Sequence, residues 1–199
     1  MLETLQNIDD AILLAVNGLH TPFLDEVMWA ISGRFTWIPL YAFLLFYLYK
    51  RTGWRKTLLW IIGIALIILI SDQICIHVFR HLFTRMRPSN PDNPISPFVH
   101  LVRGYHSGRY GFPSAHAANT GALVCYLGLI LRKKALTCTL AGWAALVCYS
   151  RMYLGVHYLG DLLGGLAFGA TVATLLYYSI SYLDRRFQLT EQTFHTSRR

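Results

Sequence analysis

The chain has 199 residues, of which 54% are hydrophobic and only 14% are charged, and its mean hydropathy is +0.39. Soluble domains carry about 25% charged residues, so this composition excludes an ordinary soluble domain and predicts one membrane-embedded domain over residues 1–199. The formal net charge of +8 does not predict nucleic acid binding, because much of the positive charge lies in short clusters beside the apolar runs, as in membrane anchors.

The N-terminal part of the chain is expected to be helical. Residues 3–19 carry an apolar stripe of roughly helical spacing, which predicts an amphipathic helix that places residues 1–20 in the membrane interface. No basic n-region precedes an apolar run, so no cleavable signal peptide is expected. The next helical segments are expected over 22–33, about 35–50 and about 56–83.

A long polar stretch over 84–111 interrupts the apolar segments and predicts an extracytoplasmic loop. Three further helices are expected over about 113–132, 135–153 and 158–183, followed by a polar cytoplasmic tail at 184–199. The predicted fold class is therefore all-α, a polytopic membrane helix bundle of about six helices. The pattern leaves open whether the chain crosses the membrane five or six times.

Basic residues indicate the orientation of this bundle. Clusters of lysine and arginine at 50–56, 132–134 and 185–186 lie beside the apolar segments and predict the cytoplasmic side. The loop at 84–111 then faces the periplasm, which predicts a multi-pass protein of the cell inner (cytoplasmic) membrane with an extracytoplasmic site at the helix ends.

Three stretches with chemistry-bearing residues end on this outer side, namely 80–88, 113–116 and 150–161. An antiparallel bundle brings such helix ends together. The residues expected to cluster there are Arg80, Arg87, Ser114, His116, Arg151, His157 and Asp161.

These residue types suit phosphoryl transfer. Arginines bind phosphate through planar, permanently charged groups, and Ser114 lies at a helix start, which favours an anion. His157 and Asp161 are four residues apart, so on a helix they share a face, and the carboxylate can hold one imidazole nitrogen while the other attacks. His116 can protonate a leaving oxygen. Together they predict a phosphohistidine mechanism.

The three stretches resemble the motifs of the type 2 phosphatidic acid phosphatase superfamily, which read K-x6-R-P, P-S-G-H and S-R-x5-H-x3-D. The third motif matches in full from Ser150 to Asp161. The second reads P-S-A-H and the first R-x6-R-P, so Ala115 replaces a glycine and Arg80 replaces a lysine. The matching region covers residues 80–161, and the six-helix plan extends the resemblance over most of the chain.

The resemblance implies a metal-independent phosphatase that needs no cofactor. In that scheme His157 attacks phosphorus, Asp161 orients it and His116 protonates the leaving group, after which water hydrolyses the phosphohistidine. The phosphate oxygens would be held by Arg80, Arg87, Ser114, Arg151 and the backbone amide of Ala115.

The partner is expected to be a lipid phosphate, with undecaprenyl pyrophosphate as the first choice. The alternatives are lipid A phosphate and then phosphatidylglycerol phosphate or phosphatidic acid, either hydrolysed or transferred to an alcohol. A function of another class is a non-catalytic transporter or anion-binding protein with this fold. A vanadate-dependent haloperoxidase shares the site plan, but such proteins are soluble. The sequence predicts no oligomeric state.

Several polar residues of the apolar segments and the loop are expected to be structural. Arg85, Arg103 and Arg109 are interpreted as membrane-edge anchors, and Asp72 is expected to pair with a polar group of another helix. The four cysteines lie in apolar segments without a CxxC spacing and are interpreted as buried thiols. A gating role for His106 is a minor alternative, and zinc bound by His116, His157 and Asp161 is disfavoured by the neighbouring arginines.

Overall fold

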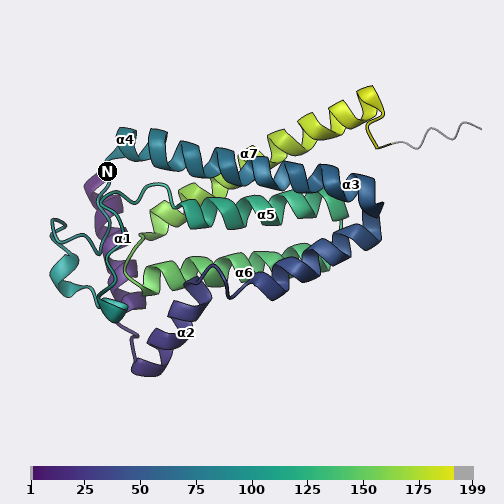
Figure 1. Ribbon diagram of the computed structural model, residues 1–199. Coiled ribbons are helices and arrows are strands. Elements are labelled where there is room, and N and C mark those ends of the chain that lie inside the picture. The colour runs from purple at the N-terminus through teal and green to yellow at the C-terminus, as the bar shows by residue number, and fades with distance from the viewer. Residues whose placement is uncertain (1, 191–199) are drawn as a thin grey trace, which may run out of the picture.

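The structure is a computed structural model that describes residues 2–190 (Figure 1). Within these residues the chain is helical and contains six helices of eleven residues or more: α1 (Leu2–Asn17), α2 (Pro22–Ser32), α3 (Ile38–Ile74), α5 (Ala115–Leu131), α6 (Lys134–Tyr153) and α7 (Leu159–Phe187). The helix bounds agree with the predicted segments except around α3 and at the end of α7. The predicted tail begins inside α7, and its part over 191–199 lies outside the described residues.

The segments predicted over 35–50 and 56–83 form one element that bends at Gly53. Gly53 has φ 75° and ψ 167°, a conformation that a residue without a Cβ adopts at little cost. The second half of α3 runs on through a π-helical turn, Cys75–Phe79, into α4 (Arg80–Phe83). The first half of α3 therefore begins beyond α2 and runs away from α1, and after the bend at Gly53 the second half returns to the end that holds α1, where α4 begins (Figure 1).

Two stretches, Ile38–Phe83 and Leu159–Phe187, are long and apolar enough to cross a membrane, and Ala115–Leu131 is a shorter apolar helix. Large apolar side chains are exposed along the outside of these helices, for example Phe43, Phe46 and Ile62. An exposed apolar surface of this extent is typical of helices that face lipid.

α5 and α7 approach each other closely because small residues lie where they cross. A Cβ atom added at Gly169 would lie 1.9 Å from the carbonyl oxygen of Ala118, so no larger residue fits there. At the outer end of this contact the backbone N–H of Ser114 donates to the carbonyl oxygen of Asp161 at 3.0 Å. This packing fixes the second and third motifs relative to each other.

α1 and α2 both lie at the end of the bundle where these motifs meet (Figure 1). The side chain of Asn17, at the end of α1, donates to the carbonyl oxygens of Tyr153 (2.7 Å) and His100 (2.9 Å). α2 begins with Thr21 as N-cap and has 11 residues, so it is only about 16 Å long and too short to span a bilayer. The amphipathic helix predicted over 3–19 is confirmed as a helix, and its place in the membrane interface stays a prediction.

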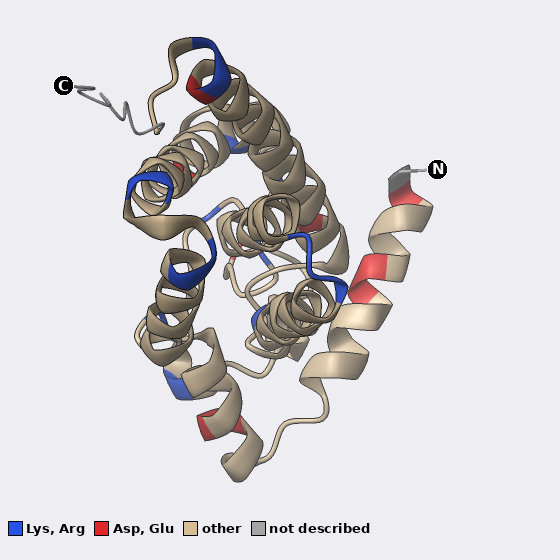
Figure 2. Ribbon diagram, turned by 90° about the vertical axis from the view of Figure 1, so that its right-hand side faces the viewer, with Lys and Arg blue, Asp and Glu red and all other residues tan. Residues whose placement is uncertain are grey.

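The basic clusters lie at the opposite end of the bundle. They occupy the bend of α3, the turn between α5 and α6, and the last turn of α7, all remote from α1 (Figure 1). Figure 2 looks onto this end, where the lysine and arginine segments mark the turns. The motifs and the basic clusters thus lie at opposite ends of the bundle, as the sequence predicts.

Candidate active site

A cavity of about 500 Å³ opens at the motif-bearing end of the bundle. Its walls come from the turn between α2 and α3, the second half of α3, α5, α6 and the long loop. Among the predicted site residues, the structure brings the following to the lining: Arg80, Arg87, Ala115, His116, Arg151 and His157. Ser114 and Asp161 lie outside the lining and are fully buried.

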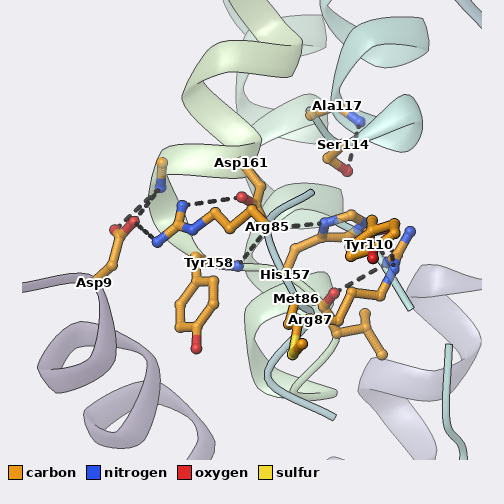
Figure 3. Close-up of polar contacts among 12 residues, drawn as sticks. Asp9, Arg85, Met86, Arg87, Tyr110, Ser114, Ala117, His157, Tyr158 and Asp161 are labelled. Carbon is orange, nitrogen blue, oxygen red and sulfur yellow. Dashed lines mark hydrogen bonds and ion pairs between the residues drawn. The ribbon is translucent and has the colours of Figure 1, made fainter. Parts of the chain in front are cut away.

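His157 and Asp161 form a buried pair beside the cavity (Figure 3). Nδ1 of the imidazole lies 3.3 Å from Oδ2 of Asp161, and the two side chains are 2% and 0% exposed. The same Oδ2 accepts the backbone N–H of Tyr158 at 3.1 Å, which completes a capping box at the start of α7. The predicted contact between His157 and Asp161 is therefore present. The two residues do not share a helix face, however, because His157 precedes Tyr158, the N-cap of α7.

The other imidazole nitrogen of His157 meets Arg87. Nη1 of Arg87 lies 2.8 Å from Nε2 and also donates to the carbonyl oxygen of Val156 at 3.1 Å. Burial lowers the pKa of His157 well below its usual value, and the charge of Arg87 lowers it further. Burial, followed by the neighbouring charges of Arg80 and Arg151, also lowers the pKa of Arg87 to about 10. The site therefore holds a neutral imidazole among cations.

Two arginines of the cavity have unused donors. Nε of Arg80 and Nε of Arg151 are buried and have no hydrogen-bond partner among the described residues. Nη1 of Arg151 donates to the hydroxyl of Ser32. A buried donor without an acceptor costs about 1–3 kcal/mol, so these groups favour a ligand with several acceptor oxygens.

Sequence reasoning missed Arg34, which also lines the cavity. It follows Gly33, where α2 ends, and a break between two apolar segments that contains an arginine was the only available signal. With Arg34 the lining contains four arginines and one carboxylate, Asp72. This excess of positive charge favours a multiply charged anion.

The start of α5 places the second motif. Ser114 is the N-cap, and its hydroxyl oxygen accepts the backbone N–H of Ala117 at 3.5 Å. Ala115 and His116 follow in the first turn and line the cavity. The hydroxyl of Ser114 thus faces the helix start in this structure, and its predicted contact with phosphate stays a prediction, as do the roles of the other site residues.

The interpretation of Arg85 as a membrane-edge anchor is wrong. Nη1 of Arg85 lies 3.0 Å from Oδ1 of Asp161, on the opposite side of the carboxylate from His157 (Figure 3). Arg103 and Arg109 differ from Arg85, since they form exposed ion pairs with Glu26 and Asp92.

The remaining polar residues have the following positions. Asp72 pairs with another helix as predicted, because its Oδ1 accepts from Nδ2 of Asn119 on α5 at 3.0 Å. Nδ1 of His106 lies 2.6 Å from the carbonyl oxygen of Ser89 within the loop. Over residues 2–190 no group of three or more His, Cys, Asp or Glu side chains is spaced to hold a metal ion. The cysteines are free thiols, and Cys138 is exposed, unlike the buried thiol expected there.

Comparison with known proteins gives a family and several relatives. A family model described as "PAP2 superfamily" matches residues 60–185. A relative from Bacteroides thetaiotaomicron named "Lipid A 4'-phosphatase" is 42% identical over 188 residues, which cover 94% of this chain and 84% of the relative. A relative from Sulfolobus acidocaldarius named "Undecaprenyl-diphosphatase" is 33% identical over 166 residues, which cover 82% of this chain and 70% of that protein.

The crystal structure of a transmembrane PAP2-type phosphatidylglycerolphosphate phosphatase from Bacillus subtilis superposes with a TM-score of 0.64 at 24% identity. The match covers 96% of this chain and 89% of the other. At this identity the likeness supports the fold alone, and it confirms the predicted membrane helix bundle.

Proposed function

This chain belongs to the PAP2 superfamily and is a membrane lipid phosphatase, and we propose that it removes the 4'-phosphate of lipid A. The relatives support lipid A, an alternative substrate in the sequence analysis, better than undecaprenyl pyrophosphate, which was the first choice there. The relative named for lipid A is more similar and is covered more completely than the relative named for undecaprenyl diphosphate. The phosphatase names of these relatives also disfavour the non-catalytic alternative.

The observation that carries the mechanism is that one cavity holds His157, whose Nδ1 contacts Asp161, together with the unpartnered Nε donors of Arg80 and Arg151. Nε2 of His157 attacks phosphorus, forming an N–P bond as the bond from phosphorus to the sugar oxygen breaks. Arg80, Arg87 and Arg151 hold the phosphate oxygens, helped by the backbone amide of Ala115 and by Ser114. The unpartnered Nε donors of Arg80 and Arg151 are buried in place before the substrate binds, so they need no rearrangement to meet its negative charge.

The leaving oxygen takes its proton from the imidazolium form of His116, which lines the cavity in the first turn of α5 and is left as a neutral imidazole. His116 then accepts a proton from water, the water oxygen bonds to phosphorus, and the N–P bond breaks to release phosphate and regenerate His157. None of these steps requires a metal ion, so the site is proposed to work without one.

An acyl chain of the substrate can lie beside the cavity of about 500 Å³ that holds the phosphate, the phosphate cavity. An apolar cavity of about 230 Å³ lies between the two halves of α3, α5 and α6. It shares part of its lining with the phosphate cavity: Tyr41, Ile68, Asn119, Thr120 and Trp143. The two neighbouring cavities therefore offer space for a phosphorylated headgroup and for an attached apolar chain.

The test is phosphate release by the purified protein in detergent with EDTA present. The substrates are lipid A carrying both sugar phosphates, undecaprenyl pyrophosphate, phosphatidylglycerol phosphate and phosphatidic acid. We expect the highest kcat/KM on lipid A. Mass spectrometry of the lipid A product is expected to show that only the 1-phosphate remains. Higher kcat/KM on undecaprenyl pyrophosphate, or loss of the 1-phosphate instead, would refute the assignment of substrate.

A further inference from the structure

Arg85 connects the first helix of the chain with the carboxylate beside His157. Its guanidinium lies between two carboxylates, with Nη1 3.0 Å from Oδ1 of Asp161 and Nη2 2.7 Å from Oδ2 of Asp9 (Figure 3). Nη2 also donates to Oε1 of Gln6 at 2.8 Å. Asp9 and Gln6 belong to α1, so Arg85 links this helix to the site.

The position of Arg85 is fixed from several sides. Its guanidinium carbon lies 4.3 Å from the ring centroid of Tyr158, a distance at which a cation and an aromatic ring attract each other. Asp9 also accepts the backbone N–H of Gly160 at 3.1 Å through Oδ1. A Cβ atom at Gly160 would lie 2.7 Å from Oδ2 of Asp9, so the contact needs a glycine. α1 therefore holds both Arg85 and the first turn of α7.

Asp161 requires a cation because its side chain is fully buried. Arg85 and Asp9 are 22% and 13% exposed, whereas Asp161 is 0% exposed. A buried carboxylate without a paired charge is strongly unfavourable. Oδ1 of Asp161 meets Arg85, and Oδ2 meets Nδ1 of His157. Because each oxygen has its own partner, Arg85 fixes the rotation of the carboxyl group and thereby the position of Oδ2.

We propose that Arg85 is a positioning residue for His157, acting through Asp161, and that Asp9 in turn positions Arg85. α1 then supports the active site, in addition to the membrane-surface position predicted for it. The inference rests on the proposed roles of His157 and Asp161. Arg85 is not among the residues that line the phosphate cavity, so its loss alters the chemical step and leaves binding of the lipid phosphate intact.

The test compares Asp9→Asn, Arg85→Gln, Arg85→Lys and the double variant with the wild-type enzyme on a lipid phosphate. Arg85→Gln is expected to lower kcat by about 10²-fold, the cost of a displacement of about 1 Å at a reacting group. KM is expected to change by less than about twofold, because only the transition state is affected. The double variant is expected to lose no more than Arg85→Gln, since Asp9 acts through Arg85.

The matched control is Arg103→Gln. Arg103 also joins the loop to an N-terminal helix, through Glu26 of α2, but this pair is 51% and 63% exposed. Its loss is expected to leave kcat unchanged. Arg85→Lys keeps the charge and is expected to retain more activity than Arg85→Gln. If Arg85→Gln does not fold, Arg85→Lys and Asp9→Asn decide the test.

A second readout does not depend on turnover. Nitrogen-15 NMR of histidine-labelled protein, with His157→Gln for assignment, reports the tautomer of His157. The wild-type protein is expected to carry the proton on Nδ1, and Asp9→Asn and Arg85→Gln are expected to mix the tautomers.

Unchanged kcat and an unchanged tautomer in Asp9→Asn and Arg85→Gln would overturn the proposal, and so would a raised KM with kcat unchanged. A wild-type protein that releases no phosphate from any lipid would instead refute the proposed function. The NMR comparison would then still decide whether Arg85 controls the tautomer of His157.

Discussion

Arg87 lies 2.8 Å from Nε2 of His157 and, together with Asp161 at Nδ1, favours one tautomer of the imidazole. A guanidinium group only donates hydrogen bonds, so Nε2 accepts and carries its lone pair. The proton is then on Nδ1, which points to Asp161. His157 is thus held in the tautomer that a nucleophile requires, and in the proposed mechanism Arg87 shifts this hydrogen bond to a phosphate oxygen before attack.

The first prediction concerns the nucleophile. His157→Ala is expected to reduce phosphate release to less than about a hundredth of the wild-type rate, because help from acid and base groups alone is worth about 10²–10⁴-fold. Phosphate release and thermal unfolding are measured together, and His106→Ala in the loop is the control histidine. Residual activity above this level in a folded protein would contradict the assignment.

The second prediction separates His116 from His157. His116→Ala is expected to slow the release of a sugar or lipid alcohol by about 10²–10⁴-fold. The first-turnover burst of p-nitrophenol from p-nitrophenyl phosphate is expected to slow much less, because that leaving group needs no proton, whereas later turnovers also need His116 for hydrolysis of the phosphohistidine. The ratio of the two rates is the measurement. Equal losses on both substrates would remove the role of His116 as general acid.

Local patterns in the sequence predict much of the fold and the centre of the site. Helical periodicity and helix-start residues give the helix bounds, and the antiparallel order of the helices places the three motifs at one end. The spacing of four residues predicts the contact between His157 and Asp161, which the structure shows at 3.3 Å. These features depend on short-range geometry, which a single sequence carries.

Contacts between distant segments were not predictable in this way. Arg85 and Asp9 are 76 residues apart, and no periodicity links a loop arginine to a helix that is expected at the membrane surface. Arg34 enters the cavity because the chain turns at the break between α2 and α3, a direction that composition does not indicate. In both cases tertiary packing decides the partner of the arginine.

The third prediction concerns metal ions and inhibitors. Vanadate is expected to inhibit phosphate release and EDTA to have no effect. Vanadate adopts the five-coordinate geometry of phosphoryl transfer, and mimics of a transition state bind more tightly than substrates. Inhibition constants for vanadate and for inorganic phosphate give the comparison. Activity that EDTA removes and added metal restores would refute the histidine mechanism.

The fourth prediction concerns the acyl chain. Ile68 lines both the apolar cavity and the phosphate cavity and is 43% exposed. Ile68→Trp therefore reduces the space where the two cavities meet without disturbing a buried core. Displacing about two buried methylene groups of the substrate costs about 1.6 kcal/mol. That cost corresponds to a rise of roughly tenfold in KM for the lipid substrate. KM for a water-soluble phosphate ester, which has no acyl chain, is expected to stay the same.

The control for this variant is Ile62→Trp. Ile62 is on the same helix and 51% exposed but does not line either cavity. Equal changes in KM for the lipid in both variants would show that the effect comes from the helix surface and would remove the proposed chain site.

The last prediction concerns the side of the membrane on which the enzyme works. The site and the long loop lie at one end of the bundle and the basic clusters at the other (Figure 1). Lysine and arginine beside membrane spans favour the cytoplasm, so the site is expected to face the periplasm. Asp92 in the loop and Lys133 between α5 and α6 are both exposed and report on opposite ends.

Cysteine introduced by Asp92→Cys is expected to react with a membrane-impermeant thiol reagent in intact spheroplasts, and cysteine introduced by Lys133→Cys only after lysis. The variants are made in a chain without native cysteines, because Cys138 is exposed. Asn93 would be a poor reporter, since it is buried and its side chain donates to the carbonyl oxygen of Arg87 at 3.0 Å. The reverse labelling pattern would place the site in the cytoplasm, where a lipid made inside would not need to be flipped before it is dephosphorylated.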